Sequence, residues 1–194
     1  VGLRPRITVS TDDQAIASHA RNHIATVIHE RPAALATDHA GYEQLKELEA
    51  FLESLGHKCH NFGPISLKPD DDYPDFIFPA AKTVASGGCE RGIILGRSGQ
   101  GEAMAANRIK GVRCAVYYGP AVTRKVVDAH GRTSHDPLEV VRLSRAHNDS
   151  NMLSLGASFV SLKDIKNVVK LWLETPFSGE NRHERRIEKL DMRG

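Results

Sequence analysis

The stretch GRSGQGE at 96–102 contains the residues best suited to chemistry. Gly99 and Gly101 let the backbone turn so that several N–H groups point at one spot at the start of a helix, which makes a site for an anion or an oxyanion. Ser98 adds a hydroxyl donor, and Glu102 places a carboxylate in the first turn of the helix. Oxyanion donors beside a carboxylate base are the equipment for moving a proton next to a carbonyl group.

Three familiar motifs fail on the same stretch. A phosphate-binding loop needs Lys and Ser or Thr where Glu102 and Ala103 stand, and the dinucleotide pattern meets Met104 at its last position. A nucleophile elbow fails at Gln100. The alternative for Glu102 is a favourable charge at the helix dipole, worth about 0.3–1 kcal/mol. Because that dipole lowers the pKa of a carboxyl group, a general base here needs burial to raise it again.

Further acid and imidazole groups follow other segments. Asp38 and His39 come directly after an apolar segment, and such a pair suits proton handling on a sugar hydroxyl or ring oxygen. The alternative is a helix-capping aspartate beside a solvated histidine. His147 and Asn148 end a helix before the last apolar segment. A lone histidine there is more often a partner of the helix dipole than a catalyst.

The run NRHERR near the end of the chain is dense in cations. Arg182, His183 and Arg186 can share one face of a helix, because residues four apart are neighbours there. Two arginines with a histidine suit the binding of a monophosphate. The alternative is a solvated amphipathic tail, which Glu184 and Glu188 favour.

Composition excludes several classes of protein. The chain has 194 residues, of which 40% are hydrophobic and 26% charged, which fits one globular domain. The net charge of +2 gives no reason to expect nucleic acid or an anionic membrane as a partner. No apolar run is long enough to span a bilayer, and the first residues lack a signal-peptide core. The three cysteines are scattered and odd in number, so we expect a reducing, cytoplasmic location. The run HKCH at 57–60 lacks a second pair of ligands, so we expect no metal.

Short apolar segments alternate with amphipathic helices from residue 31 onward. We expect strands at 32–37, 57–63, 91–96, 112–118 and 152–157, and helices at 42–56, 76–88 (with Pro79 in its first turn), 101–111, 137–148, 162–176 and from 181. This alternation predicts an α/β fold with a parallel sheet covered on both faces. Ligands of such folds bind beyond the carboxyl ends of the strands. We therefore expect TDHAG, GRSGQGE, the residues after Tyr118 and those around His147 and Asn148 to lie at that edge.

Two segments stand outside this alternation. Residues 1–30 form an N-terminal extension, in which a helix is expected after Asp12 and Asp13, ahead of the main domain at 31–194. Residues 119–137 form the longest irregular stretch, and long loops are often functional or mobile.

Five motifs together resemble one family. TDHAG, DYPD, GRSGQGEAMAANRIKGVRCA, RAHNDSNMLSLGA and NRHERR follow one another as in ribose-5-phosphate isomerase B and its relatives, the RpiB/LacAB sugar-phosphate isomerases, from about Arg31 to Arg186. The resemblance implies a Rossmann-like three-layer fold with a five-stranded parallel sheet. It also implies isomerisation of an aldose phosphate to a ketose phosphate through a cis-enediolate, without metal or cofactor. The family further implies a homodimer, in some cases a tetramer, whose active sites are shared between subunits.

The resemblance assigns a role to most of the candidates. Asp38 and His39 match a pair that binds the sugar and assists ring opening, and His147 matches a ring-opening histidine. Asn148 matches a residue that holds the enediolate, and Tyr73 one that lies near the sugar. The anion hole is matched by Ser98, Gly99 and Gly101, and a phosphate clamp supplied across the dimer by Arg182, His183 and Arg186.

The resemblance also bears on the base. Many bacterial members have a catalytic cysteine at the position of Gly96, whereas a second branch, which includes actinobacterial enzymes, uses a glutamate just after the glycine loop. The chain is similar to this branch, with Glu102 as the implied base. Insensitivity of the active site to thiol reagents is therefore expected.

Two departures from the family leave the substrate open. The family commonly carries an arginine that touches phosphate where Ser158 stands, and the segment from Gly119 to His147 is longer than usual. We hypothesise that Arg124, Lys125 or Arg132 in this insertion supplies the missing cation or reshapes the pocket. Ribose 5-phosphate is the simplest substrate. The alternatives are a tetrose or hexose phosphate, or a module that binds phosphosugars without turnover.

Overall fold

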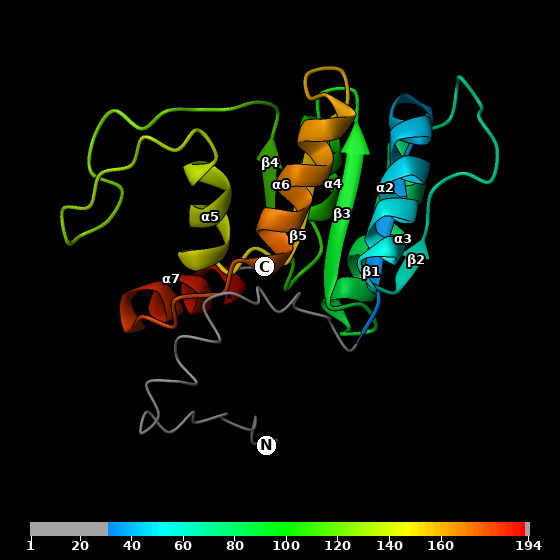
Figure 1. The fold of residues 1–194 in the computed structure, drawn as a ribbon. Coiled ribbons are helices and arrows are strands. Elements are labelled where there is room, and N and C mark those ends of the chain that lie inside the picture. The colour runs from blue at the N-terminus through cyan, green and yellow to red at the C-terminus, as the bar shows by residue number, and fades with distance from the viewer. Residues whose placement is uncertain (1–30, 193–194) are drawn as a thin grey trace.

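The computed structural model describes residues 31–192, which fold around one sheet of five parallel strands (Figure 1). The helix expected after Asp12 and Asp13 lies outside the described residues. The strands are β1 (Ala33–Thr37), β2 (Cys59–Asn61), β3 (Arg91–Gly96), β4 (Cys114–Tyr117) and β5 (Met152–Gly156), in the spatial order β2-β1-β3-β5-β4. The expected parallel α/β sheet is confirmed.

The helices cover both faces of the sheet and give three layers (Figure 1). They are α2 (Tyr42–Ser54), α3 (Tyr73–Ala85), α4 (Gln100–Ala106), α5 (Glu139–Ala146), α6 (Leu162–Glu174) and α7 (Asn181–Asp191), with a short 3-10 turn, η1 (His39–Gly41), before α2. One core cluster packs α2, α5 and α6 on alternate strand residues such as Leu35, Ile93 and Leu155. A second packs α3 and α4 on the intervening residues, such as Ala36 and Ile94. The alternation follows from successive strand side chains pointing to opposite faces.

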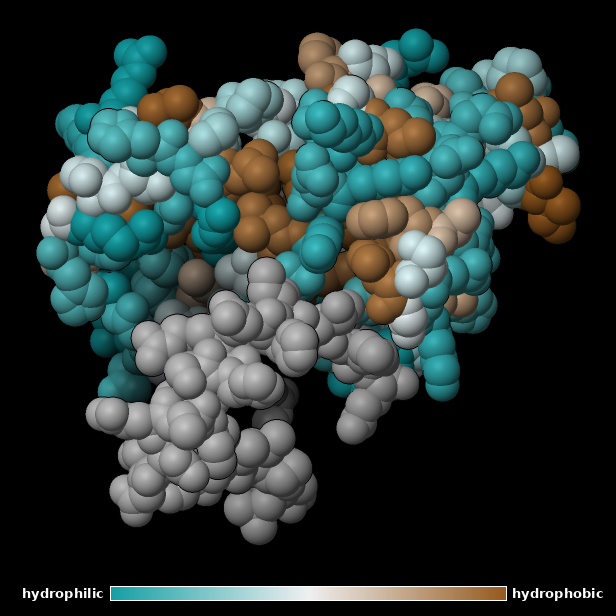
Figure 2. All heavy atoms as spheres, in the orientation of Figure 1, coloured by the Kyte–Doolittle hydropathy of each residue, from teal (hydrophilic) through white to brown (hydrophobic). Residues whose placement is uncertain are grey.

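Figure 2 shows the face that carries α2, α5 and α6, where hydrophilic side chains cover most of the surface and apolar ones gather in patches between them. The described residues contain no helix that is long and apolar enough to cross a membrane.

The helix α3 differs from its prediction. It begins at Tyr73 rather than at residue 76, after Asp72 in extended conformation, and Pro74 occupies its first turn. Proline is tolerated there because the first N–H groups of a helix have no partner within the helix. Pro79 therefore lies inside the helix and not in its first turn, so the predicted start was wrong.

The helix α4 is shorter than predicted and ends at Ala106 rather than near Gly111. Asn107 explains the early end, because its side chain pairs with the backbone of Cys114. The Asn107 Oδ1 accepts from the Cys114 N–H at 2.8 Å, and the Asn107 Nδ2 donates to the Cys114 carbonyl at 3.0 Å. The amide side chain thus ties the end of α4 to the start of β4.

The strand order fixes where a ligand can bind. From β1 the chain goes outward to β2, and it then returns to place β3 on the other side of β1. The carboxyl ends of β1 and β3 are therefore the switch point of the sheet, where open α/β folds bind their ligands. Thr37 and Gly96 end these two strands.

Candidate active site

The glycine loop follows β3 at the switch point and leads into α4. Gly99 is the N-cap of α4 with φ 76°, a left-handed conformation that favours glycine. A Cβ atom there would lie 3.0 Å from the backbone carbon of Leu155, so the loop packs directly on β5. The Ser154 hydroxyl donates to the Gly99 carbonyl at 2.7 Å and fixes the loop from below. The backbone of this loop is therefore held in place at the carboxyl ends of β3 and β5.

The carboxylate of Glu102 points back to the end of β3. Its side chain is buried, and a Cβ atom built on Gly96 would lie only 1.8 Å from its Oε1. The carboxylate thus fills the space that a side chain at position 96 would take. A glutamate at 102 in this pose and a cysteine at 96 exclude each other sterically.

For the pKa of Glu102, the sequence left open whether the helix dipole, which lowers it, or burial, which raises it, has the larger effect; in the structure burial is the larger. Desolvation raises the pKa of this carboxyl group above its ordinary value, and the negative charge of Asp38 adds to the rise. A hydrogen bond from the residue's own backbone N–H opposes the shift and is smaller than the effect of burial. Glu102 is therefore a stronger base than an ordinary surface carboxylate.

His39 is held by an aspartate that the sequence did not indicate. The Oδ1 of Asp71 lies 2.7 Å from the His39 Nδ1 and also accepts from the His39 backbone N–H at 3.0 Å. The pKa of His39 is raised, mainly by the hydrogen bond to the Asp71 carboxylate. The negative charges of Asp38 and Asp71 add to the rise, while burial and the positive charge of Arg97 oppose it. The arrangement places the Nδ1 proton toward Asp71 and leaves Nε2 for another partner.

Asp38 and Tyr73 complete this edge of the site. Asp38 is buried and caps η1, because its Oδ1 accepts from the Ala40 N–H at 2.9 Å. Tyr73 begins α3 and lies over the glycine loop, since a Cβ atom on Gly101 would meet its ring Cζ at 2.9 Å. The Ser98 hydroxyl accepts from the Gln100 N–H at 3.3 Å. The sequence-predicted residues from β1, α3 and the loop therefore come together.

The remaining predicted residues lie at the opposite edge. His147 is the C-cap of α5. The backbone N–H of Asn151, four residues later, donates to the Arg113 carbonyl. The strand β5 then begins at Met152, which pairs with Gly92 near the start of β3, so His147 lies at the amino edge of the sheet. The expectation that His147 and Asn148 lie at the carboxyl edge was wrong. The helix α5 runs against the strands, so its last residues meet the amino ends of β3 and β5, at the bottom of Figure 1.

The helix α7 lies at this same amino edge. The rings of His147 and His183 are 4.3 Å apart, and the Ser178 hydroxyl is 2.8 Å from the His183 Nδ1. Burial, and then the charge of His147, lowers the pKa of His183. Arg182 pairs with Glu180 at 2.8 Å, and Arg186 is exposed. The structure thus gathers the predicted phosphate clamp with His147, away from Glu102 in the same chain.

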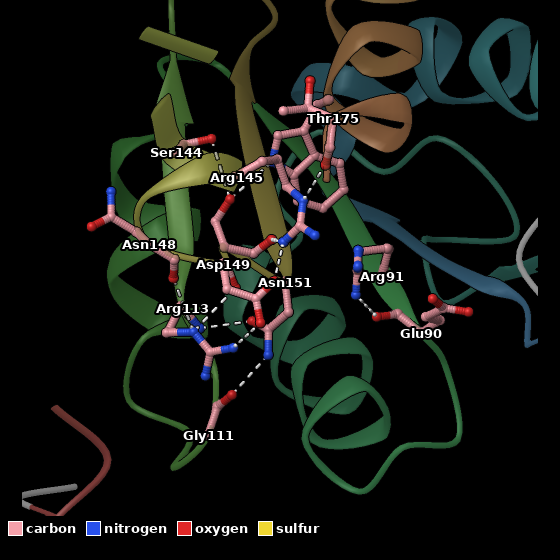
Figure 3. A network of polar contacts seen from close by, with 12 residues as sticks. Glu90, Arg91, Gly111, Arg113, Ser144, Arg145, Asn148, Asp149, Asn151 and Thr175 are labelled. Atoms are coloured by element: carbon pink, nitrogen blue, oxygen red, sulfur yellow. Dashed lines mark hydrogen bonds and ion pairs between the residues drawn. The ribbon is translucent and has the colours of Figure 1, made fainter. Parts of the chain in front are cut away.

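A polar network fixes the turn that carries His147 and Asn148 (Figure 3). Asp149, with φ 42°, is paired by Arg145 at 2.7 Å and by Arg113 at 3.2 Å. Arg145 also donates to the Ser150 carbonyl at 2.6 Å, and Arg113 donates to the Asn148 carbonyl at 3.2 Å. These bonds hold the turn while the Asn148 side chain remains exposed. Neither arginine was predicted, and Arg113 lies 35 and 36 positions from Asn148 and Asp149, which it joins.

The long loop after β4 is closed by its own ion pairs. Arg132 pairs with Glu139 at 2.6 Å and with Asp128 at 3.1 Å, so it is engaged within the loop and is not a free cation for the pocket. Its proposed contact with the substrate phosphate stays a prediction. Arg124 and Lys125 are exposed. Their proposed role stays untested.

Three potential metal ligands meet at the switch point, since ligand atoms of Asp38, His39 and Asp71 lie within 4.8 Å of one another. The atoms at the centre of this group already share hydrogen bonds, between His39 Nδ1 and Asp71 Oδ1 and between Asp38 Oδ1 and the Ala40 N–H. Burial raises the pKa of the Cys59 thiol in HKCH to about 12, which opposes the thiolate that a metal needs. The expectation of no metal stays a prediction.

These features define a Rossmann-like three-layer protein with a buried carboxylate at the switch point of its sheet. Its sequence matches the model of the ribose/galactose isomerase family over residues 33–132 and 125–190. The chain belongs to this family.

Individual relatives agree with the family assignment. The chain is 33% identical to ribose-5-phosphate isomerase B of Mycolicibacterium paratuberculosis over 80% of its length and 87% of the relative, and 35% identical to that of Mycobacterium leprae over 80% and 85%. The structure resembles a ribose 5-phosphate isomerase of Thermotoga maritima, with a TM-score of 0.71, 31% identity and coverage of 84% and 99%. It also resembles ribose-5-phosphate isomerase B of Mycoplasma genitalium with bound ribulose-5-phosphate, with a TM-score of 0.72, 28% identity and coverage of 84% and 96%.

Proposed function

We propose that the protein is an aldose–ketose isomerase that interconverts ribose 5-phosphate and ribulose 5-phosphate. The observation that carries the proposal is the Glu102 carboxylate, buried in the space left by Gly96 and raised in pKa. Membership of the ribose/galactose isomerase family supports the reaction class, and the names of the relatives support the substrate.

The chemistry is an internal exchange between C1 and C2 of the open sugar. Glu102 takes the proton from C2 while the C1 oxygen gains negative charge, which gives a cis-enediolate. Glu102 then returns the proton to C1, and the hydroxyl proton of C2 moves to the C1 oxygen. The aldehyde becomes a hydroxymethyl group and C2 becomes a carbonyl, so no external oxidant or reductant is consumed. Ser98 and the N–H groups near Gly99 and Gly101 stabilise the enediolate charge.

Ring opening precedes this step and uses groups of both edges of the sheet. Asp38 and the His39–Asp71 pair handle the hydroxyl and ring-oxygen protons beside Glu102, and Tyr73 covers the sugar. His147, Asn148 and the clamp of α7 lie at the amino edge, so we propose that a second copy of the chain supplies them to this pocket. One chain then holds the base of one site and the phosphate clamp of another, as in a cyclic homodimer.

The shared site has a direct test in mixed dimers. Glu102→Gln removes the base of a chain's own pocket, and Arg186→Gln weakens the clamp that the chain lends to its partner. Assayed well below the wild-type KM, each variant alone is expected to be inactive or nearly so. After unfolding and refolding at equal concentrations, about one quarter of all sites contain neither substitution, and activity returns to about that fraction. Activity that does not return on mixing contradicts a shared site.

The rest of the chain fits this proposal. We propose that 31–194 is the isomerase domain, 1–30 an extension and 119–137 an insertion, which is supported by the two family matches overlapping at 125–132. The three cysteines are free, in keeping with a cytoplasmic location. Dimer and tetramer remain separate outcomes of a mass measurement in solution.

Turnover of four-, five- and six-carbon aldose phosphates, followed by NMR, tests the reaction and the substrate together. The proposal predicts the highest kcat/KM with ribose 5-phosphate. A preference for a tetrose or hexose phosphate keeps the mechanism and changes the substrate. Binding without turnover of any member of the panel overturns the isomerase proposal in favour of a phosphosugar-binding module.

A further inference from the structure

Arg97 lies in the glycine loop, and none of the proposed steps of the reaction uses it. It follows Gly96 at the carboxyl end of β3, and its carbonyl accepts from the backbone N–H of Ser158 at 3.0 Å. Arg97 and Ser158 are both exposed. The Arg97 side chain therefore starts from the carboxyl edge of the sheet, where the ends of β3 and β5 meet.

The Arg97 guanidinium has no ion pair and no hydrogen bond with another residue in the range 31–192. It lies close enough to His39 for its positive charge to oppose the protonation of that ring, which Asp71 and Asp38 favour. When the His39 ring is protonated, its positive charge and that of the Arg97 guanidinium repel each other. A bound anion between the two would turn this repulsion into attraction.

We propose that Arg97 binds the phosphate group of the substrate from within its own chain, on the side of the pocket where His39 lies. A guanidinium presents N–H donors in a planar fork that matches two phosphate oxygens. Arg97 then contacts the phosphate from one chain, and the clamp of α7 contacts it from the other. The inference rests on the proposed function, because it assigns a residue to the phosphate of that substrate.

The position of Arg97 also explains how the chain can have Ser158 where the family commonly has an arginine that touches phosphate. The backbone bond between Ser158 and Arg97 places the two side chains at neighbouring points on the same edge. A cation at 97 therefore reaches the region that a cation at 158 would reach. The arginine that is missing from the family position is replaced from the neighbouring strand end, and the insertion loop is not needed for that purpose.

The experiment compares Arg97→Gln with Arg108→Gln, which removes the same charge from an exposed residue just beyond α4. For Arg97→Gln we expect KM for ribose 5-phosphate and the inhibition constant of inorganic phosphate to rise together by about 10–100-fold, the usual effect of losing a hydrogen-bonded charge pair. The value of kcat should stay within about threefold, because the reacting carbons contact other groups. Arg108→Gln should leave all three constants within about twofold.

A second variant guards against a merely structural effect. Adding Ser158→Arg to Arg97→Gln should restore the KM and the phosphate inhibition constant to within about fivefold of the wild type. Unphosphorylated ribose, tested at high concentration as an inhibitor, should bind the Arg97→Gln variant as well as it binds the wild type. If Arg97→Gln and Arg108→Gln behave alike, or if Arg97→Gln weakens ribose as much as phosphate, the inference is wrong.

Titration calorimetry with inorganic phosphate separates this inference from the proposed function. If the wild type turns over no sugar phosphate, the proposed isomerase fails, yet its affinity for phosphate can still be compared with that of Arg97→Gln. Weaker phosphate binding by Arg97→Gln than by Arg108→Gln upholds the anion contact in that case. Equal binding by the two variants refutes it whether or not the enzyme turns over.

Discussion

Gly96→Ala is expected to inactivate the enzyme by moving Glu102. The new Cβ atom would lie 1.8 Å from Oε1 and 1.9 Å from Cδ of Glu102, whereas ordinary contact begins near 3.4 Å. The carboxylate must therefore withdraw by well over an ångström from its place at the end of β3. A misplacement of about 1 Å costs catalysis on the order of 10²-fold. Because the obstructing atoms belong to the far end of a flexible side chain, the cost in stability should be modest, about 1–3 kcal/mol.

A double-mutant cycle separates this clash from other effects of the added methyl group. The assay is kcat for ribose 5-phosphate together with the free energy of unfolding in urea, for Gly96→Ala, Glu102→Ala and the double variant. The methyl group should destabilise the protein when Glu102 is present and have little effect on stability when residue 102 is alanine. A Gly96→Ala enzyme with kcat within a few-fold of the wild type would refute the assigned position of the base.

Three further predictions follow from the perturbed groups. Because burial raises the pKa of Glu102, the folded protein holds this proton more tightly than the unfolded chain and loses stability as pH rises from the ordinary carboxyl pKa through the raised one. Glu102→Gln should therefore melt at a higher temperature than the wild type at pH 7, and this difference should shrink below about pH 4.5. Asp71→Asn removes the main cause of the raised pKa of His39, so NMR titration should show that pKa lowered, with kcat reduced. Iodoacetamide at pH 7 should leave activity intact in a native enzyme, because burial raises the thiol pKa values of Cys59, Cys89 and Cys114.

The sequence predicted the part of the site that depends on local pattern. The apolar run of β3, followed by closely spaced glycines and Glu102, specifies a strand, a turn and a helix start within twelve residues or so, and the structure has these elements in that order. Asp38 at the end of β1 could be placed beside them by the rule for parallel sheets. The direction of the Glu102 pKa shift could not be predicted, because it depends on burial by segments distant in the sequence.

The parts that were missed depend on contacts across the chain. Asp71 lies 32 positions from His39, in an acidic run that indicated only a turn. The prediction for His147 is wrong because α5 runs antiparallel to the strands, which puts the end of this helix at the amino edge of the sheet. Arg132 looked free in the sequence, but it is paired with Glu139 and Asp128 once the loop has folded. Of these partners, only Asp71 is distant in the sequence, since Asp128 lies four positions from Arg132.

Isomerisation of ribose 5-phosphate by Glu102→Gln, followed by NMR at pH 7, tests the central claim most directly. The substitution keeps the size of the side chain and removes its ability to accept a proton from C2. We predict a loss of kcat of about 10²–10⁴-fold, the usual contribution of a general base, with binding of inorganic phosphate unchanged. A Glu102→Gln enzyme that isomerises the sugar within a few-fold of the wild-type rate would contradict the assignment of Glu102 as the base.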